Sequence, residues 1–371
     1  MQVKEIHGQF ADALVYTVDN PNVAIDEYAV AQIRQICDCP AMEGNRIRVM
    51  PDVHPGNGCV IGLTMTLVSD KVMPNLVGVD IGCGVSILRL ERFSPEFPRL
   101  DRLIAEKVPS GFAIHERPVD CGELEDLCCL KHVQVDKARK SFGTLGGGNH
   151  FVEIACGGDG AHYLIIHTGS RHLGKEVCEC YLRQGRRTDV PYELTWLEGD
   201  LREQYLHDMR MVQQFASDNR ERIARVILRG MKWEAVTAWE CAHNYIDFSG
   251  STPILRKGSI SAALGERVII PVNMRDGSIV GLGKGNPEWN WSAPHGSGRI
   301  STRTQTREQH TLTEFKKAMQ GIHASCISKN TLDEAPFAYR TREDLAASLG
   351  DCVDITDILR PVYNFKAGSQ K

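Results

Sequence analysis

Short hydrophobic runs, bounded by glycine and polar positions, recur along this chain and predict several strands. Runs rich in Val, Ile, Leu and Thr lie at residues 48–50, 58–68, 85–90, 163–167 and 267–272. Several of these runs are followed at once by polar or glycine-containing turns, which indicates short strands joined by tight connections.

The clearest helical pattern covers residues 201–228. Its apolar side chains keep close to helical spacing at Leu201, Tyr205, Met209, Val212, Phe215 and Ile223. Gly230 is the predicted end of this helix, because glycine often terminates helices. Further helices are predicted at residues 313–325 and 342–349.

Strands and helices follow one another irregularly, which predicts an α+β fold without a regular βαβ alternation. The chain has no internal repeat, low-complexity tract or Pro/Ser-rich linker. We therefore expect residues 1–371 to form one continuous domain.

Composition narrows the class of protein but does not decide the ligand. Apolar residues make up 42% and charged residues 24%, as in globular proteins with an ample core. We see no membrane-spanning run and no signal peptide. The 13 cysteines include no C-x-x-C pair, so we expect free thiols in a reducing cytoplasm. A net charge of −4 excludes a globally basic nucleic-acid coat but allows a local basic cleft.

The stretch from Asp80 to Cys83 combines a carboxylate and a thiolate, with Gly78, Gly82 and Gly84 around them. Both groups bind divalent metal ions, and the glycines allow backbone geometry that aims the two side chains into one cavity. The alternative is an ordinary tight turn.

A second glycine-rich stretch, GTLGGGNHFVE at residues 143–153, could bring backbone N–H groups close to phosphate oxygens. It lacks the Gly-Lys-Ser/Thr ending of a P-loop. Asn149 and His150 are placed for a ligand contact and a metal bond, and Glu153 could hydrogen-bond a base or ribose. The alternative is a flexible hairpin with a surface histidine.

Further histidines follow predicted strands or lie among glycines. His167 ends an apolar strand and is a candidate metal ligand, with Arg171 as a candidate phosphate clamp. His172 could equally be an exposed bystander. His243 is predicted on a helix, where a hydrogen-bonded core or surface histidine is the alternative.

Two proline-containing loops complete the set. In the first, Asp52 and His54 could orient a ligand or a metal partner, or could simply form a turn. In the second, His295 lies between a proline and two glycines, so we expect it to be exposed and free to act as a nucleophile toward phosphorus. The alternative for this loop is an ordinary turn. Together the loops favour a metal-dependent phosphoryl or nucleotidyl transferase.

The motifs resemble those of the RtcB family in family order from about Pro51 to Lys366. They are PDVHPGNG, VGVDIGCG, GTLGGGNHFVEI, HTGSR, HNY, RKGSISA, GKGN, HGSGR and the terminal Arg360-Pro and Phe365-Lys366. The resemblance implies mixed β-sheets flanked by helices around a central metal cleft. It also implies a GTP-dependent RNA ligase that joins 3′-phosphate or 2′,3′-cyclic phosphate ends to 5′-hydroxyl ends, in RNA repair or tRNA splicing.

The resemblance further implies roles for individual residues. Two Mn²⁺ ions would be bound by Asp80, Cys83, His150, His167 and His243, with Cys83 bridging them. His295 would be guanylylated, and GMP would pass to the RNA 3′-phosphate as an RNA-pp-G end. The guanylate would be contacted by Asn149, His150, Phe151, Val152, Glu153, His243, Asn244, Pro271, Val272, Asn273, Met274, Ser278, His295, Gly296, Ser297, Gly298 and Lys366. An archease-like activator is a further possible partner.

The chain departs from the family pattern at Val272-Asn273, where Gly-Ser is usual, and at Ser297, where alanine is usual. The first departure bears on the choice between GTP and ATP, and together they favour a divergent bacterial branch specialised for RNA repair. Zn²⁺ or Co²⁺ would also suit the ligand set. Basic residues expected to contact RNA as a local cluster are Arg183, Arg186, Arg187, Arg299 and Arg303, and the alternative for each of them is ordinary solvated charge.

Two other functions fit the same residues. One is a metal-dependent RNA cyclic phosphohydrolase that heals ends without ligating them. The other is an RNA-end-binding module with a structural metal, although binding alone requires no nucleophile at His295.

Overall fold

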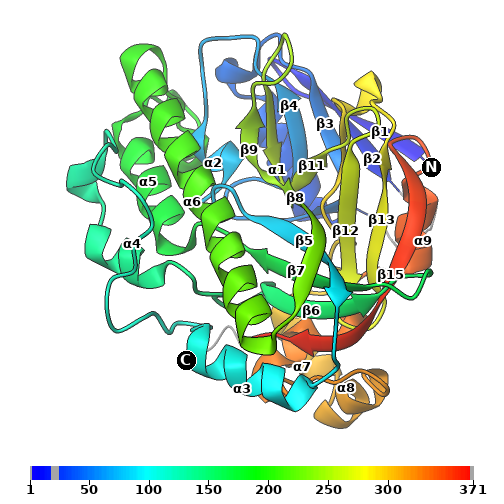
Figure 1. The fold of residues 1–371 in the computed structure, drawn as a ribbon. Coiled ribbons are helices and arrows are strands. Elements are labelled where there is room, and N and C mark those ends of the chain that lie inside the picture. The colour runs from blue at the N-terminus through cyan, green and yellow to red at the C-terminus, as the bar shows by residue number, and fades with distance from the viewer. Residues whose placement is uncertain (1, 18–24, 368–371) are drawn as a thin grey trace.

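The computed structural model describes residues 2–17 and 25–367, and its strands form two large sheets, of which the six-stranded one is mixed and the seven-stranded one is antiparallel (Figure 1). The six-stranded sheet has the order β1-β2-β3-β4-β10-β9. Its strands are β1 (Gln2–His7), β2 (Asp12–Thr17), β3 (Ile47–His54), β4 (Ile61–Thr66), β10 (Ile254–Lys257) and β9 (Asn244–Asp247). β2 and β3 pair in parallel, and the other described ladders are antiparallel.

The seven-stranded sheet has the order β12-β13-β15-β6-β7-β5-β8. Its strands are β12 (Arg267–Asn273), β13 (Gly277–Gly283), β15 (Val353–Phe365), β6 (Phe151–Cys156), β7 (His162–Thr168), β5 (Gly84–Arg92) and β8 (Glu234–Ala242). A two-stranded ladder joins β11 (Ser259–Ser261) to β14 (Ser292–Pro294). The strands predicted at residues 48–50, 85–90, 163–167 and 267–272 are confirmed, and the run at 58–68 holds the shorter strand β4.

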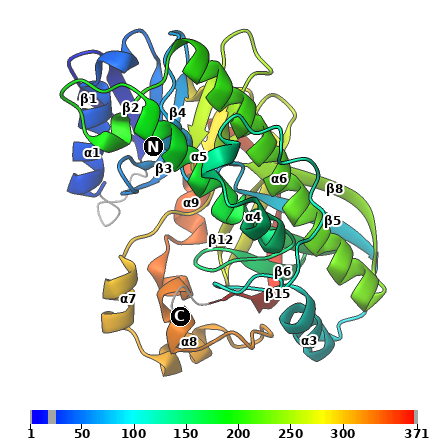
Figure 2. The same ribbon diagram turned by 90° about the vertical axis from the view of Figure 1, so that its left-hand side faces the viewer.

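Helices flank both sheets (Figures 1 and 2). They are α1 (Glu27–Cys37), α2 (Pro74–Val77), α3 (Phe97–Lys107), α4 (Val135–Ser141), α5 (Arg171–Gln184), α6 (Gly199–Met231), α7 (Arg303–Gln309), α8 (Leu312–Ala318) and α9 (Arg342–Ser348). Short 3₁₀ helices include Leu130–His132, Pro287–Trp289 and Lys329–Glu334. The predicted α+β class is confirmed.

The long helix α6 packs against α5 and against β5 and β7. Its predicted end at Gly230 is wrong, since the helix continues to Met231 and is capped by Lys232 with a left-handed φ of 57°. A Cβ at Gly230 would lie 2.4 Å from a methyl group of Leu103. This glycine therefore allows α3 to approach α6 closely and does not end the helix.

The helix predicted at residues 313–325 is wrong in its second half. α8 ends at Ala318, and Gly321 turns the chain with a φ of +90°. The helix predicted at residues 342–349 is confirmed as α9.

Successive side chains of β6 point to opposite faces of the sheet, and each face packs in a different hydrophobic cluster. Val152 and Ile154 pack in one hydrophobic cluster with Ile223 and Ile227 of α6. Phe151 belongs to the cluster on the opposite face. Because successive side chains of a strand point to opposite faces, Phe151 and Glu153 share the face that carries the site described below.

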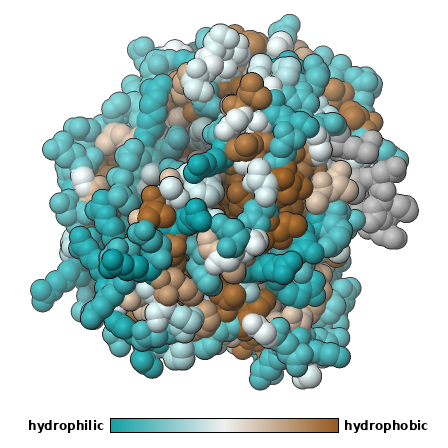
Figure 3. Space-filling model, turned by 45° about the vertical axis from the view of Figure 1, so that its right-hand side comes forward, coloured by the Kyte–Doolittle hydropathy of each residue, from teal (hydrophilic) through white to brown (hydrophobic). Residues whose placement is uncertain are grey.

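The face of the molecule shown in Figure 3 is mainly hydrophilic, and hydrophobic side chains reach the surface near its middle. Among the described helices, none combines the length and apolar character that crossing a bilayer requires.

Candidate active site

Four of the predicted metal ligands lie side by side because four neighbouring strands begin or end at the same edge of the sheet. Cys83 directly precedes β5, His150 directly precedes β6, and His167 lies near the end of β7. His243 follows β8, and the ladders pair Gly84 with both Thr168 and Ala242. The prediction of a helix at His243 is wrong, since this residue joins β8 to β9.

The donor atoms of these residues are close together and buried. Cys83 Sγ lies 3.5 Å from Nε2 of His150 and 3.5 Å from Nε2 of His167. Asp80 Oδ2 lies 3.2 Å from Nε2 of His150. The His243 ring lies 5.2 Å from that of His167, between centroids, and its buried Nδ1 has no hydrogen-bond partner. The five predicted metal ligands therefore gather at one place.

Backbone contacts orient the imidazoles toward the thiol. His150 Nδ1 lies 3.0 Å from the carbonyl oxygen of Leu145, and His167 Nδ1 lies 3.2 Å from that of Asn149. Each contact leaves Nε2 directed at Cys83, an arrangement common around metal-binding histidines. The mixed sulfur, nitrogen and oxygen donors, together with the unpartnered nitrogen of His243, fit a divalent transition-metal ion.

Burial sets the protonation of these groups. It lowers the pKa of His167 and of His243 well below the ordinary value, and neighbouring histidines add to the shift. Neutral imidazoles are the form that binds metal. Burial and the nearby Asp80 carboxylate raise the pKa of Cys83, so among the protein's own groups alone the thiol stays protonated. A bound cation would reverse that balance.

Two arginines contact the residues and loops that form the cluster. Arg220 of α6 is buried and donates to the carbonyl oxygens of Gly82 (2.8 Å) and Thr168 (2.9 Å), so it holds two of the loops together. Sequence reasoning missed it, because a helical arginine carries no local sign of this contact. Arg171, expected to clamp phosphate, instead packs beneath Gly146, 3.2 Å from His150 Nδ1.

His295 follows β14 and is held by Asp52 of β3. Its Nδ1 lies 2.8 Å from Oδ2 of Asp52, a carboxylate with no exposed surface. The expectation of an exposed histidine is wrong, because this contact leaves only 15% of the His295 side chain accessible. The ring centroid lies 4.8 Å from that of His243, so the predicted nucleophile adjoins the predicted metal ligands.

A cavity of about 240 Å³ opens beside His295. Predicted nucleotide contacts that line it are Asn149, Phe151, Glu153, Pro271, Val272, Asn273, Met274, Ser278, His295, Gly296, Ser297, Gly298 and Lys366. The remaining predicted contacts do not line it. His150 and His243 lie in the metal cluster, Val152 faces the core, and Asn244 binds the backbone of Asp80 and Gly258.

Polar groups at the floor of the cavity pair with one another. Glu153 accepts a hydrogen bond of 2.7 Å from Asn364, and burial raises the pKa of its carboxyl well above the usual range. Lys366 donates to Glu334 at 2.7 Å. Asn364, Glu334 and the cavity-lining Tyr339 were missed from the sequence, where no local motif marks them.

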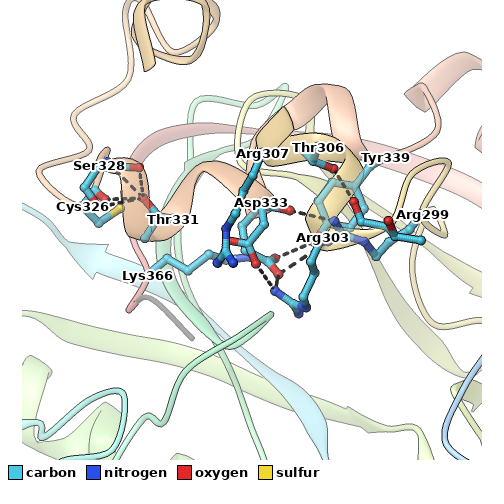
Figure 4. A network of polar contacts seen from close by, with 12 residues as sticks. Arg299, Arg303, Thr306, Arg307, Cys326, Ser328, Thr331, Asp333, Tyr339 and Lys366 are labelled. Atoms are coloured by element: carbon cyan, nitrogen blue, oxygen red, sulfur yellow. Dashed lines mark hydrogen bonds and ion pairs between the residues drawn. The ribbon is translucent and has the colours of Figure 1, made fainter. Parts of the chain in front are cut away.

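Glu334 and Asp333 draw several cations to the cavity wall (Figure 4). Arg303 contacts both carboxylates, Arg307 lies 2.8 Å from Asp333, and Arg299 lies 3.5 Å from Glu334. Arg299 and Arg303 line the cavity, as an anion-binding wall requires.

The other arginines expected to contact RNA lie at the end of α5 or just beyond it. Arg183 pairs with Glu179, Arg186 pairs with Glu198, and Arg187 stacks over Tyr192. His172 pairs with Glu176 and is not part of the cavity lining.

Comparison with known proteins identifies the family. The family described as tRNA-splicing ligase RtcB matches residues 32–367. The RNA-splicing ligase RtcB of Escherichia coli K12 is 29% identical over 371 residues, covering 86% of this chain and 90% of the relative. RtcB2 of another E. coli strain is 28% identical, covering 95% and 94%. The tRNA-splicing ligase RtcB of Archaeoglobus fulgidus is 26% identical, covering 86% and 87%. With nearly the whole chain matched, and with the expected ligands gathered beside His295, this protein belongs to the RtcB family.

Proposed function

We propose that this protein is an RNA ligase that joins 3′-phosphate or 2′,3′-cyclic phosphate ends to 5′-hydroxyl ends, with GTP as the source of GMP. Membership of a family described as tRNA-splicing ligases supports the ligase class. RNA with these two kinds of end is the substrate, and RNA repair or tRNA splicing is the setting.

One observation carries the proposal. His295 Nδ1 lies 2.8 Å from the buried Asp52 carboxylate, at the junction of the cavity and the metal-ligand cluster. A histidine used only for binding needs no such partner. A histidine that attacks phosphorus benefits from it, because the carboxylate fixes the tautomer and stabilises the positive charge that develops on the ring.

The residues support the following sequence of steps. Asp52 holds the proton on Nδ1 of His295, so Nε2 carries the lone pair that attacks the α-phosphorus of GTP while pyrophosphate leaves. The bond from Nε2 to phosphorus keeps GMP activated, because the imidazolium is a good leaving group. An oxygen of the RNA 3′-phosphate then takes the GMP. The 5′-hydroxyl attacks the RNA phosphorus of the resulting RNA-pp-G end and expels GMP.

Positively charged side chains on the cavity wall stabilise the phosphate groups that take part in these steps. Lys366 and the guanidinium groups of Arg299 and Arg303 line the cavity beside Glu334. Preorganised positive charge in a partly dry site stabilises phosphate oxygens more strongly than the same charge in water. Burial raises the pKa of the Glu153 carboxyl well above its usual range, and in its protonated form this group can donate as well as accept a hydrogen bond to a base.

Two Mn²⁺ ions are part of the proposal, held by Asp80, Cys83, His150, His167 and His243. When bound, they would polarise phosphate oxygens and neutralise their charge. We further propose that residues 1–371 form one catalytic domain, since β3 near the start of the chain and β15 near its end both supply the site. All 13 cysteines are free, which supports a reducing, cytoplasmic setting.

The test is incubation of the purified protein with Mn²⁺ and α-labelled GTP, followed by a denaturing gel and acid treatment. We expect an acid-labile label on the wild-type protein and none on His295→Ala. His172→Gln, which changes a histidine outside the cavity, should still be labelled. An unlabelled wild-type protein that still opens cyclic phosphates would identify a phosphohydrolase. Ligation by His295→Ala would refute the assignment of the nucleophile.

A further inference from the structure

A second group of metal-binding atoms lies between α6 and the segment that precedes the 3₁₀ helix Leu130–His132. Cys128 Sγ lies 3.8 Å from Nδ1 of His207, and that nitrogen lies 3.1 Å from Oδ1 of Asp208. The three donor atoms all lie within 4.8 Å of one another. None of these residues lines the catalytic cavity or belongs to its metal cluster.

The spacing matches the edges of a tetrahedral site. Zinc bonds of about 2.3 Å to sulfur and about 2.0–2.2 Å to nitrogen or oxygen place neighbouring ligands roughly 3.3–3.6 Å apart. The distance from Cys128 Sγ to His207 Nδ1 is 3.8 Å, slightly above that range, and the distance from His207 Nδ1 to Asp208 Oδ1 is 3.1 Å, slightly below it. An ion therefore fits after small adjustments of the side chains.

Asp208 is fixed in place by buried hydrogen bonds. It has no exposed surface, and Oδ2 accepts hydrogen bonds from Tyr181 Oη (2.7 Å) and the Cys129 amide (3.0 Å). Oδ1 accepts from the Cys128 amide at 2.8 Å. These contacts fix the carboxylate and the backbone of Cys128, while the Cys128 and His207 side chains stay accessible from solvent.

The arrangement does not suit nucleophilic catalysis. The same nitrogen of His207 faces both the thiol and the carboxylate, so the ring cannot relay a proton from one to the other. The Asp208 carboxylate, whose Oδ1 lies 2.8 Å from the Cys128 amide nitrogen, places negative charge beside the thiol and repels a free thiolate. A cation between sulfur and carboxylate would remove this repulsion.

We propose that Cys128, His207 and Asp208 bind a zinc-class divalent ion that joins the segment around Cys128 to α6. Binding displaces the thiol proton, leaving the thiolate as a ligand, and the imidazole carries its proton on Nε2 and binds through Nδ1. The three protein ligands leave a fourth position for water. This site goes beyond the proposed ligase function and does not depend on it.

Co²⁺ is the probe, because its bond to a thiolate gives a charge-transfer band in the near ultraviolet. The background is full-length Cys83→Ala protein, which lacks the thiolate of the catalytic cluster. We expect one equivalent of Co²⁺ with the thiolate band, which disappears when Cys128→Ser is added. Adding His207→Gln should weaken Co²⁺ binding at least about tenfold. Cys121→Ser, a cysteine outside the group, should leave the band unchanged.

Two results would overturn the proposal. One is the absence of a thiolate band in the Cys83→Ala protein, and the other is a band that survives Cys128→Ser. If Cys83→Ala fails to fold, the wild-type protein and Cys128→Ser are compared. Equal band intensity in those two proteins would also reject the site, whereas a loss in Cys128→Ser with unchanged ligation would support it.

Discussion

Oδ2 of Asp52 lies 2.8 Å from Nδ1 of His295, although the two residues are 243 positions apart in the chain. The carboxylate is fully buried and its second oxygen has no hydrogen-bond partner in the described part of the chain. A buried carboxylate lowers the stability of the folded state unless its charge is paired. His295 therefore both compensates for the burial of Asp52 in β3 and is oriented by it in the cavity.

Replacing Asp52 by Asn should slow the labelling of His295 by GTP. The amide keeps the size of the side chain but removes the charge that stabilises the imidazolium, and it can favour the wrong tautomer. We expect a fall of roughly 10²–10⁴-fold in the rate, measured with saturating α-labelled GTP. Asp12→Asn, which alters the exposed His7–Asp12 pair of 3.0 Å, is the matched control and should leave the rate unchanged. Equal rates for the two variants would exclude the proposed role of Asp52.

Glu334 should make folding sensitive to acid. Burial alone would raise its pKa, but Lys366, Arg303 and Arg299 outweigh burial and lower the pKa to about 2. Because the folded pKa is depressed, the stabilisation is complete above the unfolded value near 4.5 and is lost as the pH falls toward 2. The shift corresponds to about 3 kcal/mol.

Urea unfolding of the wild-type protein and Glu334→Gln at a series of pH values measures this contribution. The difference in unfolding free energy should be constant above pH 4.5 and should shrink as the pH falls below it. The exposed Glu106→Gln is the control and should show no such convergence. A difference that is independent of pH down to 2 would contradict the assignment.

Gly82 should not tolerate alanine. Its φ is +71°, and a Cβ would lie 2.8 Å from the Cα of Gln213 in α6. We expect Gly82→Ala to lower the free energy of unfolding by about 2–5 kcal/mol, because backbone strain adds to overpacking. Gly122 has a similar φ of +82° but open space around it, so Gly122→Ala should cost only about 1–2 kcal/mol. Equal losses in denaturant unfolding would show that the contact with α6 is unimportant.

Mn²⁺ should raise the melting temperature. An ion that binds only the folded chain stabilises it by about 2.7 kcal/mol at a hundred times its Kd, and a chelator reverses the effect. His167→Ala removes a buried donor 3.5 Å from Cys83 Sγ and should abolish most of this rise. Cys128→Ser should keep the rise, because Cys128 lies outside the catalytic cluster and leaves its ligands intact. A full rise in His167→Ala would argue against the proposed ligand.

The sequence predicted those helices and strands in which buried side chains recur with the period of the element itself. α6 shows its helical spacing because one side of the helix is buried against α5, α3, β5 and β7. The meaning of Gly230 could not be predicted, since it depends on Leu103 of a distant helix. His243 was misplaced because its short flanking runs do not distinguish a helix from two strands that pair with distant partners.

The candidate site could be predicted only where its residues lie in distinctive glycine-rich motifs. Asp80, Cys83, His150 and His295 belong to such motifs, and their resemblance to a family carried most of the residue-level prediction. Arg220 lies in the long helix α6 and Glu334 ends a short 3₁₀ helix, and neither position carries a distinctive sequence motif. Their importance comes from tertiary contacts, which no window of sequence contains.

The position of β15 has a consequence for how the protein is made. This strand lies between β13 and β6, in the interior of the seven-stranded sheet, yet it comes last in sequence among the described strands. While the ribosome is still synthesising it, the facing edges of β13 and β6 have no partner and offer unpaired backbone groups to other chains. The sheet is therefore completed only after translation has passed residue 365.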